Sequence, residues 1–165
     1  MKKQNIKTKS GFTIIEVVLV LAIAGLIFLM VFIALPALQR SQRDTQRRDD
    51  MARLATALTN WQTNHGNSLP GANEADSFLQ NYLKQSTDLA ASEFKDPNGT
   101  NYGLTIINGT GENPNLNVLA IPNIKLVTSA HCNGETAVHA TTDGANDYAI
   151  LYQLEGSGVL CQDSK

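Results

Sequence analysis

The side chains best suited to zinc chemistry lie in the last third of the chain. Imidazole and thiolate ligands are available from His131, Cys132, His139 and Cys161. Their spacing does not match that of a compact Cys/His zinc site. The sequence therefore predicts no metal-binding residues of this kind, and the two cysteines need another explanation.

Oxygen ligands suited to calcium follow in the segment TTDGANDY. Asp143, Asn146 and Asp147 would supply them, but their spacing is not that of an EF-hand. A solvated turn is the simpler interpretation of this segment. Calcium therefore remains a less favoured alternative, and no other cofactor is expected.

Enzyme motifs are missing from the sequence. It has no Gly-x-Ser-x-Gly elbow, no phosphate-binding loop and no His-Glu-x-x-His pair, and its three histidines are scattered. From residue 65 onward, four lysines and no arginine stand against eleven acidic residues. The net charge of −7 that this count leaves disfavours contact with a phosphate backbone. We expect a protein that is not an enzyme and whose C-terminal part does not bind DNA directly.

An apolar block near the N-terminus is the most specific feature of the chain. A leader with four lysines precedes residues 12–38, where Glu16 is the only ionisable side chain. As a helix, the uncharged residues 17–35 would cross a hydrocarbon core of roughly 30 Å. A charge in the middle of a membrane costs at least a few kcal/mol. Glu16 therefore needs either a partner or a position near the lipid headgroups.

The stretch GFTIIEVVLVLAIAG resembles the N-terminus of type IV prepilins and of the related pseudopilins of secretion and DNA-uptake machines. The resemblance covers about residues 7–27 and includes Gly11, Phe12, Thr13 and a glutamate at the fifth position after the junction. It implies a leader at residues 1–11, which prepilin peptidase removes by cutting between Gly11 and Phe12. It also implies that the new amino group of Phe12 is methylated.

The same resemblance gives Glu16 a partner. In the family, this glutamate pairs with the charged amino terminus of a neighbouring subunit as filaments assemble. Carried over, Glu16 would neutralise the Phe12 amine of the adjacent copy, so Phe12 and Glu16 are the predicted assembly residues. The alternative is a plain signal anchor in which Glu16 only reaches the headgroups.

A helical pattern continues past the apolar block. Residues 39–65 contain no glycine or proline, and Gly66 provides a stop. Interleaved arginines and aspartates come first and predict a solvated or charge-paired surface. Met51, Leu54, Leu58 and Trp61 then follow at helical spacing. One helix over 12–65 would be roughly 80 Å long, and its apolar stripe is expected to pack on the rest of the protein.

Gly25 and Pro36 are the positions most able to disturb this helix, through weak propensity and a lost hydrogen bond respectively. The resemblance implies that the stretch between such a glycine and proline can unwind within filaments. The commoner place for the proline in the family corresponds to Ile33. We therefore assign helix flexibility to Gly25 and Pro36 as an expectation only.

The C-terminal part, residues 66–165 and called the head below, alternates short elements with turn signals. We expect a brief helix over 76–84. The expected strands are 102–107, 117–121, 136–141, 148–155 and 158–161. Together they predict an α+β fold in which the long N-terminal helix packs on a small antiparallel sheet, as in type IV pilins.

Two features of the head extend the resemblance. The segment DPNGTNYG at 96–103 is similar to a turn that precedes the sheet in pseudopilins and some pilins. Many pilins also have a disulfide near the C-terminus that bounds an exposed region. By this resemblance, Cys132 and Cys161 would lie outside the cytoplasm and form such a bond.

The resemblance implies a structural function. The expected protein is a type IV pilus subunit with four parts: leader 1–11, filament-core helix 12–38, amphipathic continuation 39–65 and head 66–165. Its partners would be other copies of itself, the prepilin peptidase and methylase, and an assembly platform with its ATPases. It would lie in the cytoplasmic membrane before assembly and in a surface pilus afterwards, supporting attachment and twitching motility. A pseudopilin and a monomeric anchored binding domain remain alternatives.

Overall fold

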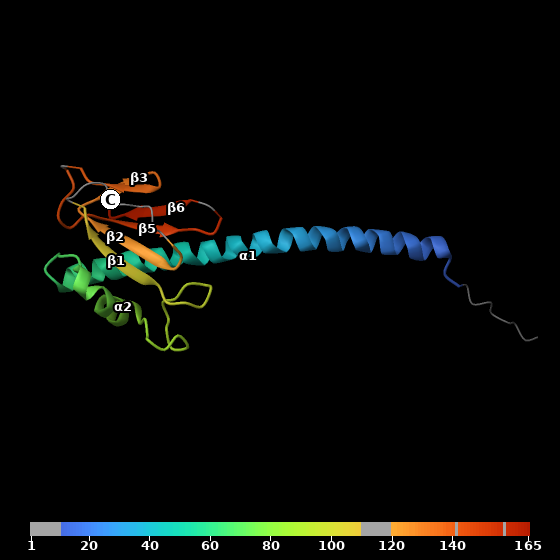
Figure 1. The fold of residues 1–165 in the computed structure, drawn as a ribbon, viewed down its shortest axis with the longest axis horizontal. Helices are drawn as coiled ribbons and strands as arrows, with labels where there is room; N and C mark the ends of the chain where they lie inside the picture. Colours follow the sequence, from blue (N-terminus) through green and yellow to red (C-terminus); the bar gives the residue numbers. More distant parts are fainter. Residues whose placement is uncertain (1–10, 110–119, 141, 157) are drawn as a thin grey trace, which may run out of the picture. The chain divides into compact units, whose positions relative to one another are not determined.

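The computed structural model describes residues 11–109, 120–140, 142–156 and 158–165. Its chain divides into two units, Met1–Gln39 and Arg40–Lys165. Helix α1, Ile14–Asn64, begins in the first unit and ends in the second (Figure 1). Residues 1–10 of the expected leader lie outside the described residues. The protein has an α+β fold with one long apolar N-terminal helix.

Helix α1 is bounded by features that the sequence places close to its ends. At the start, the Thr13 carbonyl accepts hydrogen bonds from the amides of Glu16 and Val17. At the other end, Gly66 has a φ of +62°, in the left-handed region where glycine is favoured. Asn67 is also left-handed, and its amide bonds to the Gln62 carbonyl. The helix is therefore shorter than the expected span of 12–65 by a few residues.

Two further helical segments follow. The 3₁₀ helix η1, Ala72–Glu74, leads directly into α2, Ala75–Leu83. Lys84 ends α2 in a left-handed conformation, and its amide bonds back to the Leu79 carbonyl. The short helix expected over 76–84 is thus present, one residue earlier.

A four-stranded sheet forms the other layer of the head, in the order β1-β2-β5-β6. Its strands are β1 Gly103–Asn108, β2 Asn123–Thr128, β5 Tyr148–Gln153 and β6 Val159–Asp163. The β2–β5 and β5–β6 pairs are antiparallel, but β1 and β2 run parallel. The expected antiparallel sheet is therefore confirmed for two of its three strand pairs, and the β1–β2 pair differs from the expectation. Residues 109–122 separate β1 from β2, and a connection of this length lets the chain return to the same end of the sheet.

Strand boundaries differ from the expected ones most clearly around β2. Residues 117–119 of the expected strand 117–121 lie outside the described residues, while Ala120 and Ile121 are not in a strand. The strand follows Pro122 instead. A small antiparallel hairpin, β3 His131–Asn133 and β4 Thr136–Val138, replaces the single strand expected over 136–141, whose Thr141 is outside the description.

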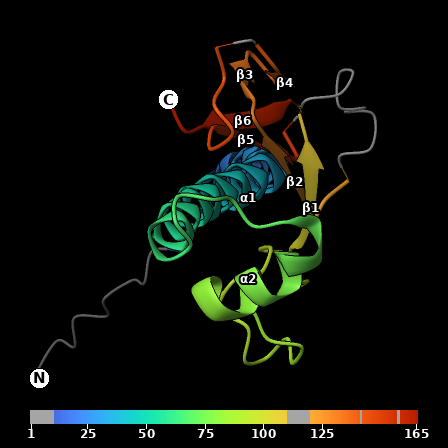
Figure 2. The same ribbon diagram turned by 90° about the vertical axis from the view of Figure 1, so that its left-hand side faces the viewer.

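The main hydrophobic core lies between the second half of α1, α2 and one face of the sheet. Figure 2 shows α2 and the sheet strands around the teal part of α1. The fully buried members of the main core include Met51, Leu54, Leu58, Phe78, Phe94, Ile124, Leu126, Ile150 and Tyr152. The expected stripe of Met51, Leu54, Leu58 and Trp61 is thus buried inside the protein itself.

The opposite face of the sheet carries a smaller apolar cluster. It consists of Val127, Ala130, Ala137, Ala149 and Leu151, with Cys132, Val159 and Cys161 packed against it. Side chains of a strand alternate between its two faces. Leu126 therefore enters the main core, while its neighbour Val127 enters the small cluster.

Candidate functional site

The described residues leave the apolar first part of α1 exposed. None of residues 12–38 is buried by the described chain, and Phe12 is 85% exposed. By length and composition, α1 is a helix that could cross a membrane. A surface of this size and chemistry suits a lipid or protein environment better than water.

Phe12 and Glu16 lie on the same side of this segment. Together with Val17, Val20 and Leu21 they border one shallow, apolar hollow. Phe12 precedes the first helical turn, and Glu16 belongs to it. In the intact chain the nitrogen of Phe12 is part of a peptide bond to Gly11, so an amine for Glu16 exists only after cleavage. The pairing of Glu16 with that amine therefore stays a prediction.

The two positions expected to weaken the helix are both helical in this chain. Pro36 lies inside α1, and so does Gly25, where an added Cβ would meet no atom within 4 Å. The glycine is therefore not required by a close contact within the chain. Unwinding between Gly25 and Pro36 concerns the assembled state and remains a prediction.

A buried ionic cluster joins α1 to two loops of the head. Its centre is Arg47, whose side chain is completely buried. The guanidinium forms a bidentate pair with the Asp96 carboxylate: Nε donates to Oδ2 at 2.7 Å and Nη2 donates to Oδ1 at 3.0 Å. It also donates to Asp44 at 2.9 Å and to Glu155 at 2.7 Å. One arginine thus holds three carboxylates.

The surrounding residues complete these contacts. Arg43 donates from Nε and Nη2 to the Glu155 carboxylate, at 2.6 to 3.0 Å. Asp44 accepts the backbone amides of Glu155 at 3.0 Å and of Gly156 at 2.9 Å. The Tyr152 hydroxyl donates to Asp96 at 2.7 Å. We call Arg43, Asp44, Arg47, Asp96, Tyr152 and Glu155 the Arg47 cluster.

The acidic members of the cluster are held in their charged form. Burial alone would raise the pKa of Asp96, but hydrogen bonds from Arg47, Tyr152 and the Asn98 amide outweigh it, so the pKa lies below its ordinary value. Hydrogen bonding from Arg43 lowers the pKa of Glu155 to about 2, against the effect of its burial. The guanidinium of Arg47 is correspondingly harder to deprotonate, because its hydrogen bond to Asp96 raises its pKa.

A neighbouring buried pair behaves differently. Asp50 accepts a hydrogen bond of 2.9 Å from the Tyr102 hydroxyl. It also forms an ion pair with Arg53 at 3.2 Å. Burial nevertheless dominates and raises the pKa of Asp50. Burial, with the nearby Asp50 carboxylate, also raises the pKa of Tyr102. Asp50 lies on α1 three residues after Arg47, whereas Tyr102 directly precedes β1.

Sequence reasoning missed the Arg47 cluster, although one signal was present. The stripe Met51, Leu54, Leu58, Trp61 extends backwards by one turn to Arg47, which therefore lies on the buried face. Asp44 is only three residues away, but Asp96 and Glu155 are 49 and 108 residues away in sequence, so no local pattern connects them to Arg47. Only the general expectation of a charge-paired surface in this stretch pointed in the right direction.

The turn at 96–103 supplies one of these partners. The Asp96 carbonyl accepts the Gly99 amide at 2.8 Å, and its carboxylate accepts the Asn98 amide at 3.0 Å. Gly99 has a φ of +93°, so this position requires glycine, whereas Asn98 is not left-handed. The turn thereby places the Asp96 carboxylate against Arg47.

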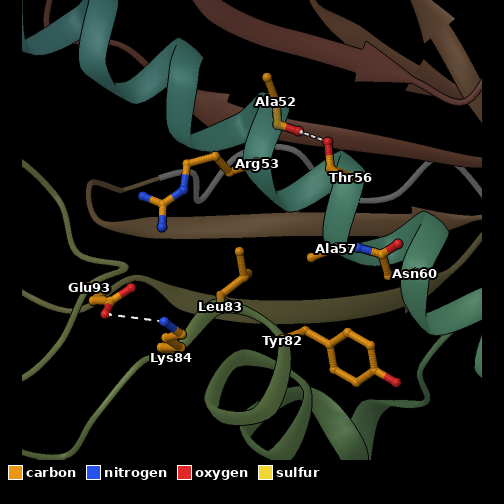
Figure 3. A pocket seen from close by; sticks show the side chains of 9 residues that line it. All are labelled: Ala52, Arg53, Thr56, Ala57, Asn60, Tyr82, Leu83, Lys84 and Glu93. Carbon is orange, nitrogen blue, oxygen red and sulfur yellow. Dashed lines mark hydrogen bonds and ion pairs between the residues drawn. The ribbon is translucent and has the colours of Figure 1, made fainter.

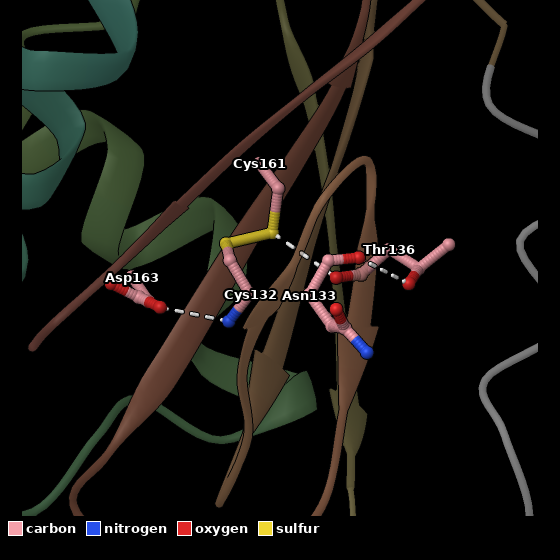
Figure 4. Close-up of a disulfide and its surroundings, with 5 residues drawn as sticks. All are labelled: Cys132, Asn133, Thr136, Cys161 and Asp163. Atoms are coloured by element: carbon pink, nitrogen blue, oxygen red, sulfur yellow. Dashed lines mark hydrogen bonds between the residues drawn. A yellow bond between two sulfur atoms is a disulfide. The ribbon is translucent and has the colours of Figure 1, made fainter.

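The predicted disulfide is present between Cys132 and Cys161. It links the β3–β4 hairpin to the edge strand β6, with Cα atoms 5.8 Å apart (Figure 4). The Cys132 amide also donates to the Asp163 carboxylate at 2.8 Å. Both cysteines are therefore committed to holding the hairpin over the small cluster.

Two carboxylates of the segment considered for calcium are paired with a lysine from another part of the chain. The Lys165 ammonium contacts Asp143 Oδ1 at 2.9 Å and Asp147 Oδ2 at 3.0 Å. His131 Nδ1 lies 2.8 Å from the other oxygen of Asp143. The Asn146 carbonyl accepts from Gln62. Within the described residues, no three His, Cys, Asp or Glu side chains are placed to hold a metal ion.

An open groove of about 400 Å³ lies between α1 and α2 (Figure 3). Its walls are Ala52, Arg53, Thr56, Ala57, Asn60, Tyr82, Leu83, Lys84 and Glu93. Lys84 and Glu93 face each other across it at 3.5 Å. The Thr56 hydroxyl is engaged with the Ala52 carbonyl at 3.0 Å. These lining residues offer no activated nucleophile.

Comparison with protein-family models, with curated proteins and with solved structures finds no match to this chain.

Proposed function

We propose that this chain is a structural subunit of a type IV pilus. The observation that carries the proposal is the stretch GFTIIEVVLVLAIAG, in which a single carboxylate sits in the first turn of an otherwise uncovered apolar helix. An anchor that only crosses a membrane does not need this carboxylate. A helix that docks beside copies of itself, each with a free amine at Phe12, has a use for it.

The polymer would form through the first part of α1. Prepilin peptidase removes residues 1–11, and the methylated amine of Phe12 pairs with Glu16 of the neighbouring copy. The apolar side chains of residues 14–38 then bury one another in place of lipid. Such a contact joins different surfaces of the two copies, so it propagates into an open helical fibre and not a closed ring.

The head would form the outer surface of this fibre. Its fold is a helix packed on a small sheet, closed by a disulfide that suits an oxidising compartment. In this proposal, the subunit lies in the cytoplasmic membrane before assembly and in a pilus at the cell surface afterwards. ATPases of the assembly platform would supply the work for extension and retraction, and thereby for attachment and twitching motility. The acidic head would repel the phosphate backbone, which disfavours direct DNA capture by this subunit.

The deciding experiment is intact-mass and N-terminal analysis of the protein in filaments sheared from cells. The proposal expects a chain that begins with N-methylated Phe12 in the filament fraction. A chain that still begins at Met1, found only in membranes, would contradict the proposal and favour a monomeric anchored domain.

A pseudopilin of a type II secretion or DNA-uptake machine is the second candidate. The turn at 96–103 favours it, because it has the Asp-Pro-x-Gly-x-x-Tyr pattern of that group. In this chain the turn also positions Asp96 against Arg47. The same fractionation distinguishes the two: a processed chain that stays with the membranes and is missing from surface filaments would indicate the pseudopilin.

A further inference from the structure

Helix α1 contacts the head through two stretches of different chemistry. Over residues 40–50 the only buried residues are Arg47 and Asp50. From Met51 to Trp61 the buried residues are apolar, and they include Leu54 and Leu58, both fully inaccessible. The contact therefore changes from ionic to apolar between residues 50 and 51.

The ionic stretch reaches the head at two turns and, at its last residue, through Asp50, which accepts a hydrogen bond of 2.9 Å from the Tyr102 hydroxyl. One is the turn at Asp96, which Arg47 holds through two hydrogen bonds. The other connects β5 to β6, where Asp44 accepts the amides of Glu155 and Gly156 while Arg43 and Arg47 bind the Glu155 carboxylate. Residues 40–50 contain no apolar side chain, so this stretch makes no hydrophobic contact with the head.

The two stretches should respond differently to disturbance. Removing one partner from a buried ionic cluster leaves uncompensated charges and is strongly destabilising at that place. The apolar stretch depends on buried area and packing, which do not involve these charges. Proteins often open in local cooperative units. The chemistry therefore allows the ionic stretch to open while the apolar stretch stays packed.

We propose that the Arg47 cluster is a latch that holds residues 40–50 of α1 against the head. When the latch opens, these residues leave the two turns, while residues 51–61 remain in the core. The head can then give way next to its connection with the apolar segment without unfolding. In a fibre under tension this would provide a first, reversible step of extension, a consequence that rests on the proposed function.

Hydrogen exchange of the full chain in detergent tests the latch directly. The variant Glu155→Gln keeps the shape of the side chain and removes the charge that Arg43 and Arg47 share. Arg47→Met removes the centre of the cluster. Arg48→Met, one position along the same helix and exposed, is the matched control. Peptides covering 43–50 and 54–61 are compared in each variant.

The latch predicts that amides in 43–50 exchange about tenfold faster in Glu155→Gln, the factor expected for one lost hydrogen bond between charged groups. Exchange in 54–61 should stay within about twofold of the wild type, as should both peptides in Arg48→Met. Arg47→Met should increase the first effect further. If Arg47→Met does not fold, Glu155→Gln still decides the question.

Two results would overturn the latch. Equal acceleration in both peptides would mean that the cluster and the core open as one unit, and no acceleration would mean that the cluster does not hold the helix. Because the exchange measurement does not require filaments, neither result depends on filament formation. Processed protein in sheared fibres together with equal acceleration would reject the latch alone, whereas an intact latch in an unprocessed chain would reject the pilus alone.

Discussion

The two ends of helix α1 use apolar side chains in opposite ways. Residues 14–38 expose theirs, including Phe28 at 65% and Leu29 at 59%, and no part of the described chain buries them. In residues 51–61 the stripe of Met51, Leu54, Leu58 and Trp61 is buried in the main core. The second surface is satisfied within one copy, but the first needs lipid or other copies. One helix thus carries a surface that is buried within the described chain and a second surface that the described chain leaves exposed.

The largest expected effect concerns the assembly end. Glu16→Ala should abolish or sharply reduce filaments, because the Phe12 amine of the neighbouring copy loses its counter-charge. The chain should remain in the membrane, since removing a charge makes the segment more apolar. Filament yield after shearing, together with membrane fractionation, measures both. Val18→Ala is the control, and normal fibres from Glu16→Ala would reject the pairing.

The next prediction compares one aromatic residue from each end. Trp61 is almost fully buried and has its ring 5.6 Å from that of Phe78 and 5.3 Å from that of Tyr82. Trp61→Ala should lower the free energy of unfolding of the head by about 3 to 5 kcal/mol. Phe28→Ala, the matched change at the exposed end, should leave it unchanged.

Denaturant unfolding in detergent, followed by near-ultraviolet circular dichroism, measures this pair of variants. A similar loss of stability in both would mean that the exposed end also packs on the head. No loss in Trp61→Ala would mean that the core does not depend on the stripe of α1. Either outcome would remove the distinction between the two ends.

The disulfide sharpens the comparison from the side of the head. Cys132 and Cys161 are 29 residues apart. Closing a loop of this size contributes roughly 3 to 4 kcal/mol in the chain-entropy description. Cys132→Ser together with Cys161→Ser should lower the free energy of unfolding of the head by roughly 3 to 4 kcal/mol, and with it the unfolding temperature, without affecting the helicity of residues 14–38. Calorimetry with and without reductant checks it; reductant should not affect the double variant.

Local patterns were sufficient to predict several parts of this fold. The apolar block, the stripe from Met51 to Trp61 and the stop at Gly66 each follow from neighbouring residues, and the structure agrees with these patterns. The short helix after residue 74 followed from its apolar spacing in the same way. These elements depend on composition and periodicity, which a single sequence displays directly.

Other parts depend on contacts between distant segments. Strand β2 was missed because Pro122 and Asn123 read as a turn and Lys125 interrupts the apolar run. Its parallel pairing with β1 is a property of the sheet and has no local signature. The Arg47 cluster is similar, since Asp96 and Glu155 become its partners only after the turns that carry them reach α1.

The smallest expected effect is an acid sensitivity at the ionic stretch of α1. Hydrogen bonds from Arg43 and Arg47 lower the pKa of Glu155 from an ordinary value of 4.5 to about 2 in the folded protein. Because of this lowered pKa, the Glu155 carboxylate is protonated at a lower pH in the folded state than in the unfolded state. Glu155 therefore contributes its full stabilisation above pH 4.5 and loses it as the pH falls towards 2.

Glu155→Gln should remove this part of the pH dependence. Between pH 4.5 and 2, the free energy of unfolding should fall more in the wild type than in the variant. The difference in stability between the two proteins should therefore become smaller. Because Asp44 and Asp96 also have a lowered pKa, the variant should retain some acid sensitivity of the same sign. Urea titrations of both proteins at several pH values measure this difference. If the difference in unfolding free energy between the wild type and Glu155→Gln stays constant down to pH 2, the two arginines do not hold the Glu155 carboxylate. That result would contradict the role given to Glu155 in the contact between residues 40–50 and the head.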